Sequence, residues 1–149
     1  STIAILEAQV RELENQRTHR IMHEIIEENK TNYLGSVNVV KASIPYLTKT
    51  QGGILLFTSS SFTRGRALYS IYSSTKAAIV NFMQAQADEL SIIDIRINAI
   101  NPERTDTEMR IQNFGYEPKS ELLKPSAVAK VSLQTLLSDY TGQVIDIRK

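Results

Sequence analysis

The chain has 149 residues, of which 42% are hydrophobic, enough for one globular domain and short for two. Lysine and arginine number 17 against 16 acidic residues, so no global charge favours nucleic acid or an anionic membrane surface. The absence of cysteine excludes disulfides and thiolate metal sites and fits a cytoplasmic location. No apolar run reaches ~18 residues, so we expect neither a membrane span nor a signal peptide.

Residues 1–29 predict a helical leader, because they contain no glycine or proline and are rich in residues that favour helix. Four of its apolar residues alternate spacings of three and four, as in a coiled-coil seam: Ile3, Leu6, Val10 and Leu13. The seam is short, so an amphipathic helix packed on its own domain or on a partner is the alternative. His19 and His23 lie four apart, but with no third ligand evident we predict no metal site.

The family resemblance described below implies a second helix at residues 30–49, with Asn32 near its start and Pro45 near its end. From the residues alone, the Asn32 side chain is a helix cap or a surface amide.

The central stretch of the chain predicts a strand, a loop and a helix in succession. Residues 54–57 form a buried apolar strand, a turn with Ser59 and Ser60 follows, and a helix opens near Tyr72. The carboxyl ends of parallel strands face the ligand crevice in an open α/β sheet, so we expect Ser59 and Tyr72 to meet there. The helix is apolar on more than one face, which predicts burial on two sides.

Tyr72 and Lys76 are four residues apart, so on a helix they share one face. A tyrosine hydroxyl titrates near pH ~10 in water and is a poor acid or base at neutral pH. A lysine ammonium close to it favours the phenolate and lowers its pKa. The pair therefore has the chemistry of a general acid or base, and the alternative is an ordinary surface contact between two helical side chains.

The rest of the chain predicts two more strands and one more helix. Residues 95–100 form the second strand and residues 125–137 an amphipathic helix. The closing strand, at residues 140–148, is what the family resemblance described below implies. The predicted fold class is α/β, with about three parallel strands behind a long N-terminal amphipathic helix.

The order Ser59-x12-Tyr72-x3-Lys76 resembles the catalytic core of the short-chain dehydrogenase/reductases, which move hydride between a nicotinamide cofactor and a carbonyl or alcohol. Three further segments over residues 30–148 match that family in order: Asn32-x-x-Gly35, the loop ending in Thr107 and Met109, and the closing Thr141-Gly142 strand. The resemblance implies the second half of a Rossmann-like, doubly wound parallel sheet. It also implies a homodimer or homotetramer.

The resemblance implies four catalytic residues: Tyr72 as acid or base, Lys76 lowering its pKa and contacting the ribose, Ser59 (with Ser60 in reserve) orienting the carbonyl, and Asn32 in a proton relay. It implies that four residues contact NAD(H) or NADP(H): Tyr72, Lys76, Pro102 and Thr107. Two departures stand out. Glu103 replaces the usual glycine beside the cofactor, and Glu28 and Asn29 are polar where the family is usually apolar.

The glycine pattern lacks the loop that receives a dinucleotide pyrophosphate. The six glycines form neither a Gly-x3-Gly-x-Gly nor a Gly-x-Gly-x-x-Gly sequence. We therefore expect the second half of the family's domain at residues 30–149, behind the leader. The strand at 54–57 would then leave an apolar edge open to pairing with another chain.

Arginines in two loops indicate an anionic substrate, because guanidinium groups bind phosphate or carboxylate through forked hydrogen bonds. Arg64 and Arg66 follow the serine turn, and Arg104 and Arg110 follow the second strand, so both loops should cap the same crevice. Solvated surface arginines are the alternative. The predicted substrate contacts are Ser59, Ser60, Arg64, Arg66 and Arg104.

Three segments are also similar to the ribulose-5-phosphate reductase branch of the family, which serves capsule and teichoic-acid synthesis: residues 57–78, 101–107 and 136–148. A pentulose phosphate fits the arginines. A hypothesis from a different class is a non-catalytic oligomerisation or interaction protein built on a reductase remnant that no longer binds cofactor.

Overall fold

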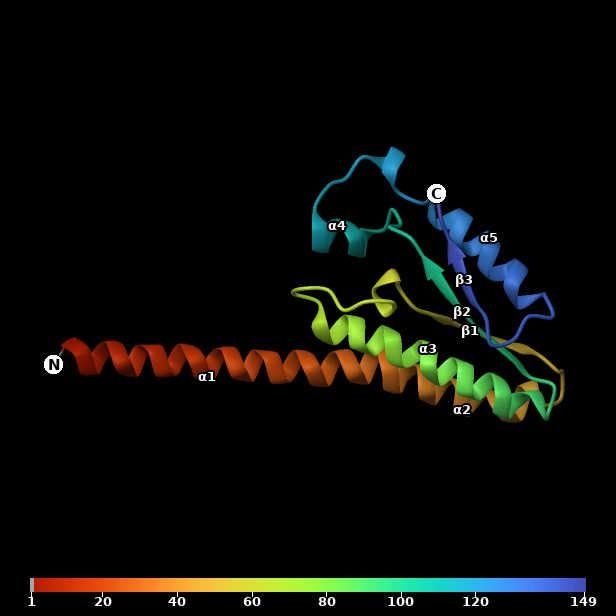
Figure 1. Ribbon diagram of the computed structural model, residues 1–149, viewed down its shortest axis with the longest axis horizontal. Helices are drawn as coiled ribbons and strands as arrows, with labels where there is room; N and C mark the ends of the chain where they lie inside the picture. The colour runs from red at the N-terminus through yellow and green to blue at the C-terminus, as the bar shows by residue number, and fades with distance from the viewer. Residues whose placement is uncertain (1) are drawn as a thin grey trace.

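The computed structural model describes residues 2–149, and its first third is one helical rod (Figure 1). Helix α1 (Thr2–Glu28) passes into a π-helical segment, η1 (Asn29–Leu34), and then into α2 (Gly35–Leu47). The helices predicted for residues 1–29 and 30–49 are both present. Helix α1 extends away from the rest of the molecule and buries none of its residues, which is consistent with a helix formed by intrinsic propensity.

Three parallel strands form one sheet in the order β1-β2-β3. The strands are β1 (Gly53–Phe57), β2 (Arg96–Pro102) and β3 (Val144–Ile147). Helix α3 (Ser70–Ser91) connects β1 to β2, and α5 (Pro125–Leu136) lies between β2 and β3. This confirms the predicted α/β class. Strand β1 lies at one edge of the sheet, as expected, and its last residue, Phe57, keeps 48% of its surface exposed.

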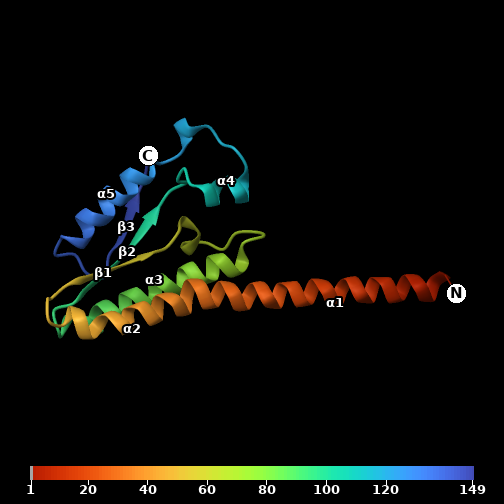
Figure 2. The same cartoon turned by 180° about the vertical axis from the view of Figure 1, so that it is seen from behind.

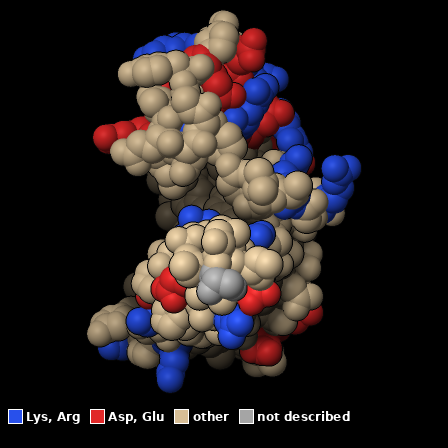
Figure 3. Space-filling view, turned by 90° about the vertical axis from the view of Figure 1, so that its left-hand side faces the viewer, with Lys and Arg blue, Asp and Glu red and all other residues tan. Residues whose placement is uncertain are grey.

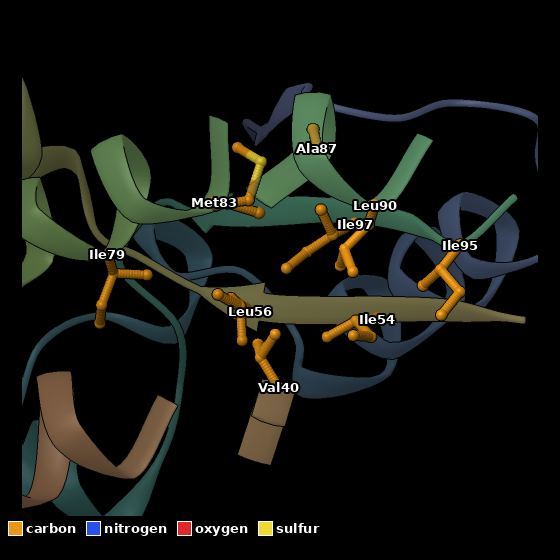
Figure 4. Packing of buried hydrophobic residues seen from close by; sticks show 10 residues of the cluster. Val40, Ile54, Leu56, Ile79, Met83, Ala87, Leu90, Ile95 and Ile97 are labelled. Carbon is orange, nitrogen blue, oxygen red and sulfur yellow. The ribbon is translucent and has the colours of Figure 1, made fainter. Parts of the chain in front are cut away.

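Helices cover both faces of the sheet: α2 and α3 pack on one face and α5 on the other (Figures 1 and 2). Strand β2 is central and buries five consecutive residues, as two-sided coverage of a parallel strand requires. The main core lies between the sheet and the helices α2 and α3 (Figure 4). It comprises Val40, Ile54, Leu56, Ile79, Met83, Ala87, Leu90, Ile95, Ile97 and Ala99.

Three short segments complete the fold: η2 (Ser60–Phe62), α4 (Glu108–Phe114) and η3 (Lys119–Glu121). The sequence patterns did not predict α4, because it has seven residues and buries none of them. Its formation rests on capping. The Thr107 hydroxyl accepts a hydrogen bond from the Arg110 amide at 3.2 Å, and Gly115 ends the helix with φ +76°. Within residues 2–149, every helix is too short or too polar to traverse a bilayer.

Candidate active site

A buried threonine joins the end of β1 to helix α3. Thr58 is 4% exposed, and its hydroxyl donates to the Lys76 carbonyl at 2.9 Å while its amide donates to the Ile100 carbonyl at 2.9 Å. One residue thus bonds to both α3 and the neighbouring strand β2. This contact fixes the position of Lys76 relative to the carboxyl edge of the sheet.

The Lys76 ammonium lies beside the end of β1. Its Nζ donates to the Phe57 carbonyl at 3.0 Å and lies 5.6 Å from the centroid of the Tyr72 ring. Burial lowers the pKa of Lys76 below its ordinary value, and the Glu28 carboxylate opposes that shift. The structure therefore brings the predicted tyrosine and lysine together on one face of α3.

Ser59 follows Thr58 directly and is the N-cap of η2. Its hydroxyl shares a 2.8 Å hydrogen bond with the Ser61 hydroxyl and accepts from the Ser61 amide at 3.3 Å. Both Ser59 and Ser60 are partly buried. The structure places Ser59 at the carboxyl end of β1, where the sequence predicted it.

Asn32 lies in the π-helical segment and reaches across to α3. Its Nδ2 donates to Glu28 Oε2 at 2.6 Å and to Thr75 Oγ1 at 3.3 Å, and Thr75 Oγ1 donates to the Tyr72 carbonyl at 2.8 Å. The Asn32 carbonyl accepts from the Ser36 hydroxyl at 2.7 Å. π-Helical turns occur frequently at functional sites, and this one connects Asn32 to the turn that carries Tyr72 and Lys76.

The predicted cofactor contacts after β2 lie at the same edge of the sheet. Pro102 is the last residue of β2, and Thr107 is the N-cap of α4. Between them, Glu103 has no left-handed φ, so its backbone does not require the glycine that is usual there. Its carboxylate instead accepts from the Lys149 amide at 3.1 Å.

Two of the predicted arginines share one carboxylate. Arg110 makes a forked contact to Glu117 at 2.6 and 3.0 Å, and Arg104 approaches the same carboxylate at 3.3 Å. The hydrogen bond from Arg110 lowers the pKa of Glu117. The Arg110 guanidinium also lies 4.0 Å from the Phe114 ring centroid, and Phe114 stacks on Tyr69 at 5.7 Å. These contacts link the α4 segment to the loop before α3.

Arg64 and Arg66 lie on the exposed loop between η2 and α3. The surface is hollowed between the α4 segment above and the helices α1 to α3 below, with Lys and Arg atoms along the lower rim (Figure 3). The α4 segment and the loop between η2 and α3 both lie at this end of the molecule (Figure 1). That their arginines cap one crevice stays a prediction.

Four residues of the site were absent from the sequence-based set: Glu28, Thr58, Thr75 and Glu117. Spacing offers a signal for two of them, because Glu28 lies four residues before Asn32 and Thr75 three after Tyr72. Thr58 immediately follows the apolar strand, a place where a hydroxyl satisfies strand-end groups. No pattern in the sequence points to Glu117.

The residues at the carboxyl edge fit the nicotinamide and ribose end of a dinucleotide. The Lys76 ammonium has no ion-pair partner within 4.0 Å among the residues described, and its donor capacity beyond the Phe57 bond suits ribose hydroxyls. The pyrophosphate end has no counterpart in the glycine pattern. His19 and His23 are exposed on α1, and within residues 2–149 no three His, Asp or Glu residues gather as metal ligands would.

The parallel sheet, covered on both faces, thus has a tyrosine and a lysine on one helix face at its carboxyl edge. A sequence model of the family described as short chain dehydrogenase matches residues 7–116. The chain belongs to this family.

Two curated relatives and one solved structure illustrate the match. The chain is 50% identical over 124 residues to the bifunctional ribulose 5-phosphate reductase/CDP-ribitol pyrophosphorylase Bcs1 of Haemophilus influenzae, covering 83% of this chain and 26% of that protein. It is 35% identical over 121 residues to the uncharacterized oxidoreductase YciK of Escherichia coli (strain K12), covering 78% and 48%. A 3-oxoacyl-[acyl-carrier protein] reductase of Brucella melitensis with bound NAD matches with a TM-score of 0.70 at 28% identity, covering 83% and 50%. The chain therefore spans between a quarter and a half of these relatives' lengths.

Proposed function

We propose that the chain is the catalytic half of a reductase that uses NAD(H) or NADP(H) and reduces the carbonyl of a pentulose phosphate. The observation that carries the proposal is the Tyr72 and Lys76 pair at the sheet edge. The 50% identity to the Haemophilus protein, whose name includes ribulose 5-phosphate reductase, supports the substrate class. The comparisons give no support to the alternative of a non-catalytic interaction protein.

The proposed roles divide the reduction among four side chains. When bound at this edge, a reduced nicotinamide would provide the hydride that the carbonyl carbon accepts. Tyr72 donates its proton to the carbonyl oxygen, so the product is a hydroxyl group. The Lys76 ammonium stabilises the tyrosinate that remains. Ser59 hydrogen-bonds the carbonyl oxygen, and Asn32 belongs to the path that returns a proton to Tyr72.

The substrate phosphate is assigned first to Arg64 and Arg66. Arg104 and Arg110 already share the Glu117 carboxylate, whereas the two loop arginines have no acidic partner within 4.0 Å among the described residues. Arg104 is half exposed and stays in the proposed set beside Ser60. A phosphate dianion that enters the crevice would compete with Glu117 for Arg104.

We further propose a cytoplasmic homodimer or homotetramer in which the leader at residues 1–29 is distinct from the reductase segment at 30–149. The exposed edge of β1 supports pairing with a further segment or a further chain. The family match begins at residue 7, inside the leader, so the boundary between the two parts is a question for limited proteolysis.

The test measures reduction of ribulose 5-phosphate by the purified chain, followed by loss of the reduced nicotinamide absorbance. Tyr72→Phe removes the proton donor and should lower kcat by about 10²–10⁴-fold. Tyr69→Phe is the matched control, because it removes a hydroxyl three residues away and keeps the ring that stacks on Phe114. Comparison with unphosphorylated ribulose isolates the contribution of the phosphate.

Binding of NADPH and NADH to the same sample is measured by the fluorescence of the reduced nicotinamide, with its mass in solution. The proposal is supported if the chain binds a cofactor and if turnover is lost in Tyr72→Phe but kept in Tyr69→Phe. A well-folded oligomer that binds neither cofactor would contradict it for this chain and would favour the interaction-protein hypothesis.

A further inference from the structure

Glu28 is the last residue of α1 and lies where that helix meets the active site. The residues of α1 up to Glu24 are exposed, but Glu28 is partly buried. Its Oε2 accepts the Asn32 amide at 2.6 Å, the shorter of the two bonds that this amide donates. A carboxylate that accepts an amide proton at this distance forms a charge-assisted hydrogen bond, which is stronger than a neutral one.

A chain of contacts leads from Glu28 to the turn that holds Lys76. The Asn32 amide also donates to Thr75 Oγ1 at 3.3 Å, and Thr75 immediately precedes Lys76 on α3. Thr75 is 2% exposed and donates in turn to the Tyr72 carbonyl. The end of α1 is therefore linked, through Asn32 and Thr75, to the helical turn that carries Tyr72 and Lys76.

Burial and charge act on Lys76 in opposite directions. Burial lowers the pKa of Lys76, and Glu28 is the charged group that raises it. Around the ammonium, α3 contributes Tyr72 and β1 contributes the Phe57 carbonyl but no titratable side chain. Segment η1 contributes Asn32 and two titratable residues: Tyr33, which packs edge-on against Phe82, and Lys30, which is exposed. The carboxylate is thus the group that can offset the cost of burying a positive charge there.

We propose that Glu28 is a positioning residue of the active site, which fixes the Asn32 amide and supplies the negative charge that compensates the Lys76 ammonium. The catalytic meaning rests on the function proposed above, but the electrostatic link does not. In the reductase, a charged Lys76 is the form that stabilises the tyrosinate of Tyr72. Loss of the Glu28 charge would favour the neutral amine and weaken that stabilisation.

The test uses Glu28→Gln, which removes the charge and keeps an oxygen that accepts from Asn32. The Lys76 side chain is titrated by NMR on chain labelled with [13Cε]lysine, without cofactor, and Lys76→Arg assigns its signal. We expect the Lys76 titration midpoint to fall by about one pH unit, a moderate value for a nearby and partly screened charge. Glu27→Gln is the matched control, because Glu27 is the exposed neighbour on the same helix.

A second measurement is the dependence of kcat on pH. The part of this profile that reflects titration of Lys76 should move to lower pH in Glu28→Gln. It should not move in Glu27→Gln. A Lys76 midpoint that is equal in Glu28→Gln and the wild type would overturn the inference, even in an active enzyme. A shifted midpoint in a chain without turnover would uphold it while the proposed function fails. If Glu28→Gln does not fold, Glu28→Asp keeps the charge and must retain the wild-type midpoint. A fall in that variant would also overturn the inference.

Discussion

Helices α1 and α3 are of similar length, 27 and 22 residues, yet they are stabilised in different ways. Helix α3 buries seven residues and carries Tyr72 and Lys76, whereas α1 buries none. Both sequences lack glycine and proline within the helix. The difference teaches that α1 relies on intrinsic propensity in this structure, while tertiary packing fixes α3, which holds the proposed catalytic pair.

The end of α1 is joined to α3 through Asn32, next to the proposed catalytic pair. Asn32 bonds to Glu28 at the end of α1 and to Thr75 of α3. The exposed part of α1 has no such contact with the body of the molecule (Figure 1). Substitutions should therefore lower the free energy of unfolding most in α3, less at the junction and least in the outer part of α1.

The largest difference between the two helices is expected when a methionine in each is replaced by alanine. Met83 of α3 is 0% exposed, and Met83→Ala should lower the free energy of unfolding by about 2–5 kcal/mol because it leaves a cavity in the core. Met22 of α1 is 52% exposed, and Met22→Ala should change it by less than about 0.5 kcal/mol. Urea unfolding of both variants checks the contrast, which fails if the two midpoints fall equally.

A smaller, pH-dependent effect is expected at Lys76, beside the junction. Burial lowers the pKa of Lys76 in the folded state below its ordinary value of 10.5. At pH values below the folded-state pKa, the buried positive charge therefore lowers the free energy of unfolding. Between the two pKa values the folded state has already released its proton, so wild-type stability rises with pH relative to a variant without this group. Above 10.5 the cost has disappeared.

Lys76→Met should therefore be at least as stable as the wild type at pH 7, and its advantage should shrink toward pH ~10, the reference region for lysine titration. Urea unfolding at both pH values measures the difference. Lys41→Met, at an exposed lysine of α2, corrects for general effects of removing a charge. An advantage that grows with pH would contradict the direction assigned to Lys76.

Much of the fold was predictable from local patterns. The strand at 54–57 and the helix that opens near Tyr72 carry clear signals of apolar run and period, and the structure has both. Helix α4 and the Glu117 contacts were not predictable, because they depend on a cap and on ion pairs between segments that no period encodes. The assignment of catalytic roles stays a prediction, since the structure gives proximity but not reactivity.

The finest test of the comparison places a glycine in each helix at an exposed alanine. Ala8 lies in the outer part of α1 and Ala85 on the solvent side of α3, and both side chains are exposed. An alanine-to-glycine change in an exposed helix interior costs about 1 kcal/mol wherever the helix must form. In α3 that cost should appear in cooperative unfolding, because the helix and the sheet fold together.

In α1, the same cost should appear only as faster amide hydrogen exchange of the helix, because its outer turns open without unfolding the body. Ala85→Gly should then lower the urea midpoint while Ala8→Gly leaves it unchanged. An equal fall in both variants would mean that α1 is stabilised by packing in solution, either on the body or on a second copy of the chain. In that case its seam of Ile3, Leu6, Val10 and Leu13 is buried, and the drop should depend on protein concentration only if a second copy covers it.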